Sequence, residues 1–191
     1  MNTDTKAIRH QSFPDTINRW HILWVTVLVI LLDQATKLRV SYFMQLGESL
    51  SVLGDFFRLT YITNTGAAFS FSLGNDEINR LFFIVVSIVA ILVFLFLLIK
   101  ERRLITRIAY ALILGGAFGN LIDRILYGAV IDFFDFKFFS FIMERWPVFN
   151  IADSAIVIAI FLLLFDLIVA PKDEKPGEGT ENNFQTIEES L

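Results

Sequence analysis

The chain has 191 residues, of which 55% are hydrophobic and 19% are charged, and its formal net charge is −4. Soluble domains carry about 25% charged residues. Here the apolar residues form long blocks, which excludes a disordered chain, a basic surface that binds nucleic acid, and an ordinary soluble globule. Because the chain has no cysteine and only two histidines, His10 and His21, disulfides, thiolate metal sites and imidazole catalysis are not expected, and no metal or cofactor is predicted.

A membrane-spanning helix needs about 20 mainly apolar residues, and four stretches qualify: residues 20–40, 81–99, 105–126 and 150–170. The first stretch is too long for the apolar region of a cleaved signal peptide and lacks a small-residue cleavage site before Asp33. We therefore predict a mainly α membrane protein with four transmembrane helices in residues 20–170. We expect residues 1–19 to form a cytoplasmic arm and residues 171–191, rich in Glu, Gly, Pro and Asn, to form a disordered cytoplasmic tail.

The orientation of the helices follows from the distribution of Lys and Arg, which are enriched in cytoplasmic loops. Nine of the 16 basic residues lie in the N-terminal arm, around residues 100–107, and in the tail; the other seven lie in or beside the opposite loops. This bias places both termini in the cytoplasm and the long loops 41–80 and 127–149 outside.

The two outer loops carry predicted structure of their own. Residues 50–71 mix apolar and polar positions and predict two or three short strands, with a turn at Thr65-Gly66. Residues 133–146 are aromatic and amphipathic, which is typical of a segment that lies at the membrane interface. Such a segment can act as a lid over a bound peptide. No internal repeat is evident, which argues against a transporter built from inverted halves.

Polar residues in and beside the apolar blocks converge on one layer near the predicted outer interface. The layer lies late in the first and third helices, which run outward, and early in the fourth, which runs inward. Ionisable groups within a membrane are costly and therefore mark candidate functional sites. The residues of this layer are Asp33, Lys37, Asn64, Asn120, Arg124, Asp132, Asn150 and Asp153.

Asp33 and Lys37 allow two interpretations. They are four residues apart, so they either form a helical ion pair that makes the helix insertable or face a substrate. A hydrolytic pair of Lys37 with Ser41 or Ser70 is also possible, although Lys37 already has a carboxylate neighbour. A serine–histidine site is excluded because both histidines lie toward the cytoplasmic end.

The remaining helix-end residues have structural interpretations as well. Asn150, with Asp153 three positions further on, has the form of a helix N-cap. Arg124 can extend to the interface, and we expect Asp123 to face water. Asp166, at the other end of the fourth helix, is expected to reach the interface or to pair with a loop Lys or Arg.

A pairing of Asp132 with Asp153 would give these residues a chemical role. Two carboxylates in a partly dehydrated site cannot both ionise cheaply, so the pair shares a proton. Such a dyad can take a proton from a water that attacks an amide carbonyl and can donate one to the departing nitrogen. Asp135 is a competing partner, which we rank lower because of the Phe-rich segment around it.

Five sequence blocks, taken in order, resemble the lipoprotein signal peptidase family, also called signal peptidase II. Any one block is weak, but five in family order and spacing over residues 20–170 are highly specific. The blocks are Asp33-Gln-Ala-Thr-Lys37, Asn64-Thr-Gly-Ala-Ala-Phe-Ser70, Gly115-Gly-Ala-Phe-Gly-Asn120-Leu-Ile-Asp-Arg124, Val130-Ile-Asp132-Phe and Phe149-Asn-Ile-Ala-Asp153-Ser.

The resemblance implies an intramembrane aspartic endopeptidase of the bacterial cytoplasmic (inner) membrane. Such an enzyme removes signal peptides from diacylglyceryl-modified prolipoproteins by cutting before the lipidated cysteine, and the cyclic peptide globomycin inhibits it. By position, Asp132 and Asp153 match the catalytic pair, and Asp33 and Lys37 match a motif whose role looks more structural. The residues that match positions lining or supporting the substrate site are Asn64, Gly66, Asn120, Arg124 and Asn150.

A second class of function has to be weighed against the peptidase. A small non-enzymatic transporter or scaffold could use Asp33, Asp132 and Asp153 as a proton relay. A relay would string ionisable groups across the bilayer, whereas here they gather at one face, and residues 81–99 carry none. The clustering favours the peptidase.

Overall fold

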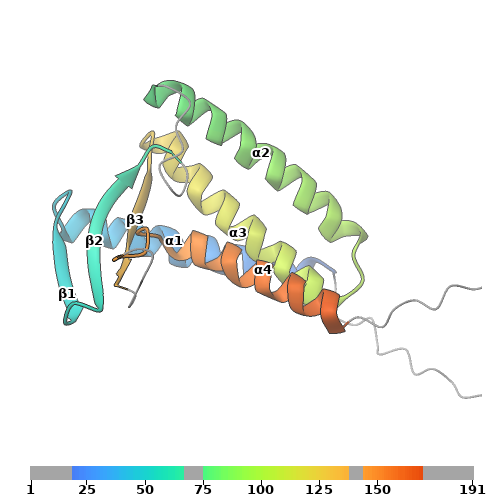
Figure 1. The fold of residues 1–191 in the computed structure, drawn as a ribbon. Helices are drawn as coiled ribbons and strands as arrows, with labels where there is room; N and C mark the ends of the chain where they lie inside the picture. The colour runs from blue at the N-terminus through green and yellow to red at the C-terminus, as the bar shows by residue number, and fades with distance from the viewer. Residues whose placement is uncertain (1–18, 67–74, 138–143, 170–191) are drawn as a thin grey trace, which may run out of the picture.

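The computed structural model describes residues 19–66, 75–137 and 144–169. In this part of the chain, four helices are long and apolar enough to cross a membrane, and a small three-stranded antiparallel sheet lies at one end of the bundle (Figure 1). The predicted fold class is thus confirmed. The elements are a short 3₁₀ helix η1 (Arg19–Ile22), α1 (Leu23–Phe43), β1 (Ser49–Leu53), β2 (Phe57–Asn64), α2 (Asp76–Lys100), α3 (Leu104–Leu126), β3 (Val130–Phe136) and α4 (Ile151–Val169).

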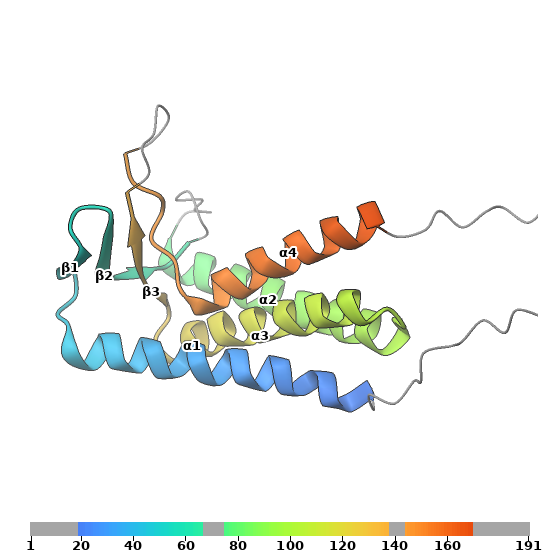
Figure 2. The same ribbon diagram turned by 90° about the horizontal axis from the view of Figure 1, so that it is seen from below.

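The start of α1, the end of α4 and the connection between α2 and α3 lie together at the end of the bundle opposite the sheet (Figure 2). The described basic residues of the α2–α3 connection and its surroundings, from Lys100 to Arg107, are therefore far from the sheet. This arrangement gives the protein one end rich in basic groups and one end where strands and helix termini meet.

Helix α2 begins five residues earlier than its apolar block predicts. Asn75 caps the helix, because its side-chain oxygen accepts a hydrogen bond from the backbone N–H of Ile78 at 2.8 Å. Asp76 and Glu77 in the first turn add negative charge where the helix dipole favours it. These polar residues extend the helix beyond the apolar block of residues 81–99.

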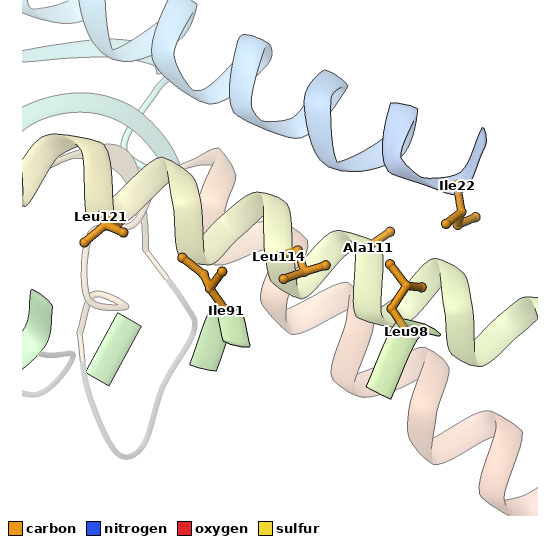
Figure 3. Close-up of a cluster of buried hydrophobic side chains, with 6 residues drawn as sticks. All are labelled: Ile22, Ile91, Leu98, Ala111, Leu114 and Leu121. Atoms are coloured by element: carbon orange, nitrogen blue, oxygen red, sulfur yellow. The ribbon is translucent and has the colours of Figure 1, made fainter. Parts of the chain in front are cut away.

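Helix α3 occupies the centre of the bundle and packs against each of the other three helices. Glycines permit this close approach: a Cβ added to Gly115 would lie 2.6 Å from the Cβ of Val29 in α1, and one added to Gly116 would lie 2.5 Å from the carbonyl oxygen of Ala152 in α4. Small residues at helix interfaces are the main means by which membrane helices pack closely. On the side facing α2 the packing is formed by apolar side chains, and Ile91 and Leu98 of α2 belong to the same buried cluster as Leu114 of α3 (Figure 3).

The sheet has the strand order β1-β2-β3, with both pairs antiparallel. Strands β1 and β2 and a bend at Thr65-Gly66 confirm the prediction for the first outer loop. The third strand differs from the prediction: Phe133 to Phe136 belong to β3, a strand of the sheet that the sequence analysis did not predict, while their expected location at the membrane interface stays a prediction. The physical reason is that β3 finds a partner in β2, where Ile62 pairs with Asp132 and Asn64 pairs with Val130.

After β3 the chain returns alongside the same strand. The N–H of Trp146 donates to the carbonyl of Phe136 at 2.9 Å, and Phe134 and Phe149 exchange hydrogen bonds across an isolated bridge. This return places the residue after Phe149, which is Asn150, next to the first half of β3. Residues 138–143, the middle of the proposed lid, lie outside the described residues, so the lid stays a prediction.

Candidate active site

Asp132 lies in the middle of β3 and is 2% exposed. Its two carboxylate oxygens each accept a hydrogen bond from an asparagine side chain. Nδ2 of Asn150 donates to Oδ1 at 2.7 Å, and Nδ2 of Asn64, at the end of β2, donates to Oδ2 at 3.2 Å. Asp132 is therefore held at both oxygens by neutral amides, with no cation in direct contact among the described residues.

Asp153 lies in the first turn of α4, and both of its carboxylate oxygens also accept hydrogen bonds from amides. Nδ2 of Asn120 in α3 donates to its Oδ1 at 2.8 Å, and the backbone N–H of Asn150 donates to its Oδ2 at 3.2 Å. The side-chain oxygen of Asn150 in turn accepts from the N–H of Asp153 at 2.9 Å. This reciprocal arrangement is a capping box, so the structural interpretation of Asn150 and Asp153 is confirmed.

Asn150 joins the two carboxylates. Besides its bond to Asp132, its Nδ2 lies 3.1 Å from Oδ1 of Asn120, the residue that donates to Asp153. Asn150 is fully buried, and buried amides are stable only when their hydrogen-bonding groups find partners. The cap of α4 therefore also fixes both carboxylates relative to each other.

The site also changes the acidity of Asp132. Burial and the negative charge of Asp153 together raise the pKa of Asp132 to about 7, although the hydrogen bonds from Asn64 and Asn150 oppose the rise. The two carboxylates thus interact electrostatically, as the predicted dyad requires. Near neutral pH, Asp132 is poised to hold or release a proton.

Arg124 and Gly66 border the same site. The Arg124 guanidinium lies over the Phe83 ring, with 5.0 Å from Cζ to the ring centroid, and its Nη2 lies 3.4 Å from the carbonyl oxygen of Gly66. The N–H of Gly66 donates to Oδ1 of Asn64 at 3.0 Å, which orients the amide of Asn64 toward Asp132. Within the described residues, Nε of Arg124 is buried without a hydrogen-bond partner. Arg124 thus borders the site, so extension to the membrane interface does not by itself account for its position.

Asp33 and Lys37 form the predicted ion pair, with 2.8 Å between Nζ and Oδ2, and both are almost completely buried. A second carboxylate joins them, because Nζ of Lys37 also lies 2.9 Å from Oδ2 of Asp123. The expectation that Asp123 faces water is wrong: its side chain is fully buried, since Lys37 supplies the compensating charge. Gln34 is a further member of this cluster that no local sequence signal marks, and its Nε2 donates to Oδ1 of Asp123 at 2.9 Å.

The other candidates lie apart from the carboxylate pair. Asp135 accepts from Arg145 Nε at 2.8 Å and from the hydroxyl of Thr60 at 2.7 Å, so it belongs to an ion pair on the sheet. The hydroxyl of Ser41 donates to the carbonyl of Leu38 and does not contact Lys37 in the described structure, and Ser70 lies outside the described residues. Asp166 pairs with Arg103, which confirms its expected pairing with a loop residue.

The fold and the site together define a class of protein: a multi-pass membrane protein with a buried and a partly buried carboxylate side by side at the junction of its helices and its sheet. Comparison with known proteins supplies the family. The description "Signal peptidase (SPase) II" belongs to the family whose model matches residues 25–169. The chain therefore belongs to the signal peptidase II family, whose members are peptidases.

Individual relatives support this assignment. A lipoprotein signal peptidase of Syntrophus aciditrophicus (strain SB) is 47% identical over 150 residues, covering 77% of this chain and 91% of the relative. One of Alteromonas mediterranea is 41% identical over 173 residues, covering 86% and 93%. A solved bacterial membrane enzyme, determined by the in meso method at 2.3 Å resolution, matches with a TM-score of 0.71 and 31% identity, covering 83% of this chain and 95% of that structure. These similarities do not favour a transporter or scaffold.

Proposed function

We propose that this member of the family is an intramembrane aspartic endopeptidase in which Asp132 and Asp153 are the catalytic pair. The observation that carries the proposal is the shared amide network: Asn150 contacts both carboxylates, and every carboxylate oxygen of the pair accepts a hydrogen bond from an amide. Neutral donors orient a carboxylate without neutralising its charge, as an acid–base pair requires.

The pair would work with one proton shared between two carboxylates. The ionised carboxylate takes a proton from a water molecule as that water attacks the scissile carbonyl, and the protonated carboxyl stabilises the developing oxyanion. A proton then moves to the departing nitrogen as the C–N bond breaks. The raised pKa of Asp132 supports this division of roles, because it keeps a proton on the pair close to neutral pH.

The substrate would be held beside the dyad by the residues that border it. Arg124 presents a half-buried cation that interacts electrostatically with Asp132 and Asp153, so its guanidinium is suited to bind a peptide carbonyl beside the pair. Asn64 and Gly66 form a turn at the end of β2, where a peptide can approach the sheet. Asn120 supports Asp153 from α3. Asp33 and Lys37 have no hydrogen bond or ion pair to the carboxylate pair among the described contacts.

We infer that the enzyme lies in the cytoplasmic membrane with both termini in the cytoplasm. The basic residues at the end of the bundle opposite the sheet support this orientation, because Lys and Arg are enriched on the cytoplasmic side. The sheet and the carboxylate pair then lie near the outer interface. A prolipoprotein with a diacylglyceryl-modified cysteine would arrive laterally among the membrane lipids, with its scissile bond near that depth.

The direct test is cleavage by the purified full-length protein in lipid bilayers. A diacylglyceryl-modified prolipoprotein is incubated with it, and the product masses are measured. We expect cleavage immediately before the modified cysteine, no cleavage of the same precursor without the lipid, and inhibition by globomycin. Equal cleavage of modified and unmodified precursors would contradict the proposed substrate class.

A further inference from the structure

The buried cluster around Lys37 reaches the backbone next to each member of the carboxylate pair. The ammonium of Lys37 contacts Oδ2 of Asp33 at 2.8 Å, Oδ2 of Asp123 at 2.9 Å and Oδ1 of Asn120 at 3.0 Å. Two carboxylate oxygens and one amide oxygen thus surround the ammonium nitrogen of Lys37. Lys37 is 1% exposed, and both carboxylates are fully buried.

Each carboxylate of the cluster binds a backbone N–H one residue before a proposed catalytic aspartate. Oδ2 of Asp123 accepts from the N–H of Ile131 at 3.0 Å, and Ile131 precedes Asp132 in β3. Oδ1 of Asp33 accepts from the N–H of Ala152 at 2.9 Å, and Ala152 precedes Asp153 in α4. Lys37 holds both carboxylates in place, so it indirectly holds the two backbone segments that carry the pair.

The third contact of Lys37 fixes the orientation of the Asn120 side-chain amide. Oδ1 of Asn120 accepts from Lys37 and from Asn150, at 3.0 and 3.1 Å. An ammonium has no acceptor, so the oxygen of Asn120 must face Lys37 and its NH₂ group must face Asp153. The charge of Lys37 also polarises the amide, which strengthens its hydrogen bond to Asp153.

We propose that Lys37 is a positioning residue for the proposed peptidase reaction, acting through Asp33, Asp123 and Asn120 on both members of the carboxylate pair. An ion pair that only made α1 insertable would need one carboxylate. The second carboxylate and the amide, each leading to the pair, have no purpose in that interpretation. The inference rests on the proposed function and adds a residue in α1 to the machinery carried by β3, α3 and α4.

Lys37 also acts on the pair through its charge. The charged groups that act on Asp132 include Asp153 in α4, Arg124 in α3 and Lys37 in α1, and the positive charge of Lys37 lowers the pKa of Asp132. Replacing the ammonium by a neutral group removes this effect. The pKa of Asp132 then rises, and the pH at which the pair loses its shared proton moves upward.

The test uses the purified full-length protein, a diacylglyceryl-modified prolipoprotein, and steady-state kinetics across a range of pH. For Lys37→Met we expect kcat to fall about 10- to 100-fold, because small misplacements of reacting groups have effects of this size. KM should change far less, since Lys37, Asp33 and Asp123 are buried and offer no surface to a substrate. The pH above which activity falls, the upper limb of the pH profile, should move upward.

A second variant covers the case in which Lys37→Met does not fold. Asp123→Asn is nearly isosteric, but it cannot accept hydrogen bonds at both side-chain atoms, so kcat should again fall with little change in KM. Because this variant removes a negative charge, the upper limb should move to lower pH, opposite to Lys37→Met. A loss of stability alone would not produce shifts of opposite sign.

The matched control is Arg103→Met. Arg103 pairs with Asp166 and so joins α3 to α4 at the end of the bundle far from the sheet. We expect it to lower the melting temperature but to keep kcat and the pH profile. If Lys37→Met or Asp123→Asn folded and kept both the wild-type kcat and the wild-type pH profile, the inference would be overturned. If the wild-type protein did not cleave the precursor, or Asp132→Asn did, the proposed function itself would fail instead.

Discussion

Nδ2 of Asn150 lies 2.7 Å from Oδ1 of Asp132, so the residue that caps α4 also binds a carboxylate of β3. The return of the chain alongside β3, fixed by the bridge between Phe134 and Phe149, brings these two residues together. One buried asparagine thereby connects the start of a membrane helix with a strand of the sheet. Its capping function and its proposed role in the site can be separated by substitution.

Asn150→Ala should remove both functions of this side chain. Loss of an N-cap costs about 0.5–2 kcal/mol of stability, and the loss of the amide between the carboxylates should reduce kcat. Asn150→Ser should recover most of the stability, because serine is a good N-cap, but its hydroxyl is too short to replace the contact with Asp132. Thermal unfolding and kcat of the two variants check this prediction. Equal kcat for Asn150→Ser and the wild type would contradict a role in the site.

The pH dependence of turnover follows from the raised pKa of Asp132. Activity requires one proton on the pair, and burial together with Asp153 raises the pKa of Asp132 to about 7. Below this pH the shared proton is present, and above it the proton is lost. We expect kcat/KM to fall by about tenfold for each pH unit above the limb, as for loss of a single essential proton. A profile that is flat from pH 6 to 9 would contradict the shared-proton account.

Asn64→Leu should move that limb in a defined direction. The hydrogen bond from Asn64 lowers the pKa of Asp132, because it stabilises the ionised carboxylate. Its removal should raise the pKa, so activity should persist to higher pH even though kcat decreases. Measurement of kcat/KM against pH for the variant and the wild type tests the sign. A limb displaced to lower pH would show that Asn64 does not stabilise the charged form.

Gly116→Ala tests the packing of α3 against α4. The added Cβ would lie 2.5 Å from the backbone carbonyl oxygen of Ala152, the residue before Asp153, and backbone cannot move aside as a flexible side chain can. Overpacking of this kind costs about 1–3 kcal/mol, and the displaced first turn of α4 should reduce kcat. Ile125→Ala, at an exposed position of the same helix, is the control and should retain kcat. Unchanged stability of Gly116→Ala would contradict the packing.

Much of this architecture can be predicted from the sequence. Four apolar blocks predict four helices, and the spacing of Asp33 and Lys37 allows the ion pair that the structure shows. The sequence blocks also identify the polar residues that meet at one end of the bundle. These features can be predicted from the sequence because helix length and i,i+4 spacing are local properties of the chain.

The features that could not be predicted depend on tertiary contacts. The run of phenylalanines in β3 is typical of an interfacial segment, and only its pairing with β2 makes it a strand. No local feature of the sequence reveals that Asp123 is buried and does not face water. Its burial depends on Lys37, 86 positions earlier in the chain, and on the N–H of Ile131. Neither contact leaves a local signal.

The central claim is that Asp132 and Asp153 perform the hydrolysis, and the most direct measurement is the cleavage rate of a diacylglyceryl-modified prolipoprotein by three purified Asp→Asn variants. Asp135→Asn is the matched control, because Asp135 lies three residues from Asp132 in the same strand but pairs with Arg145. We predict that Asp132→Asn and Asp153→Asn lose at least about 10³-fold in kcat, while Asp135→Asn stays close to the wild type. Substantial cleavage by either Asp132→Asn or Asp153→Asn would contradict the account.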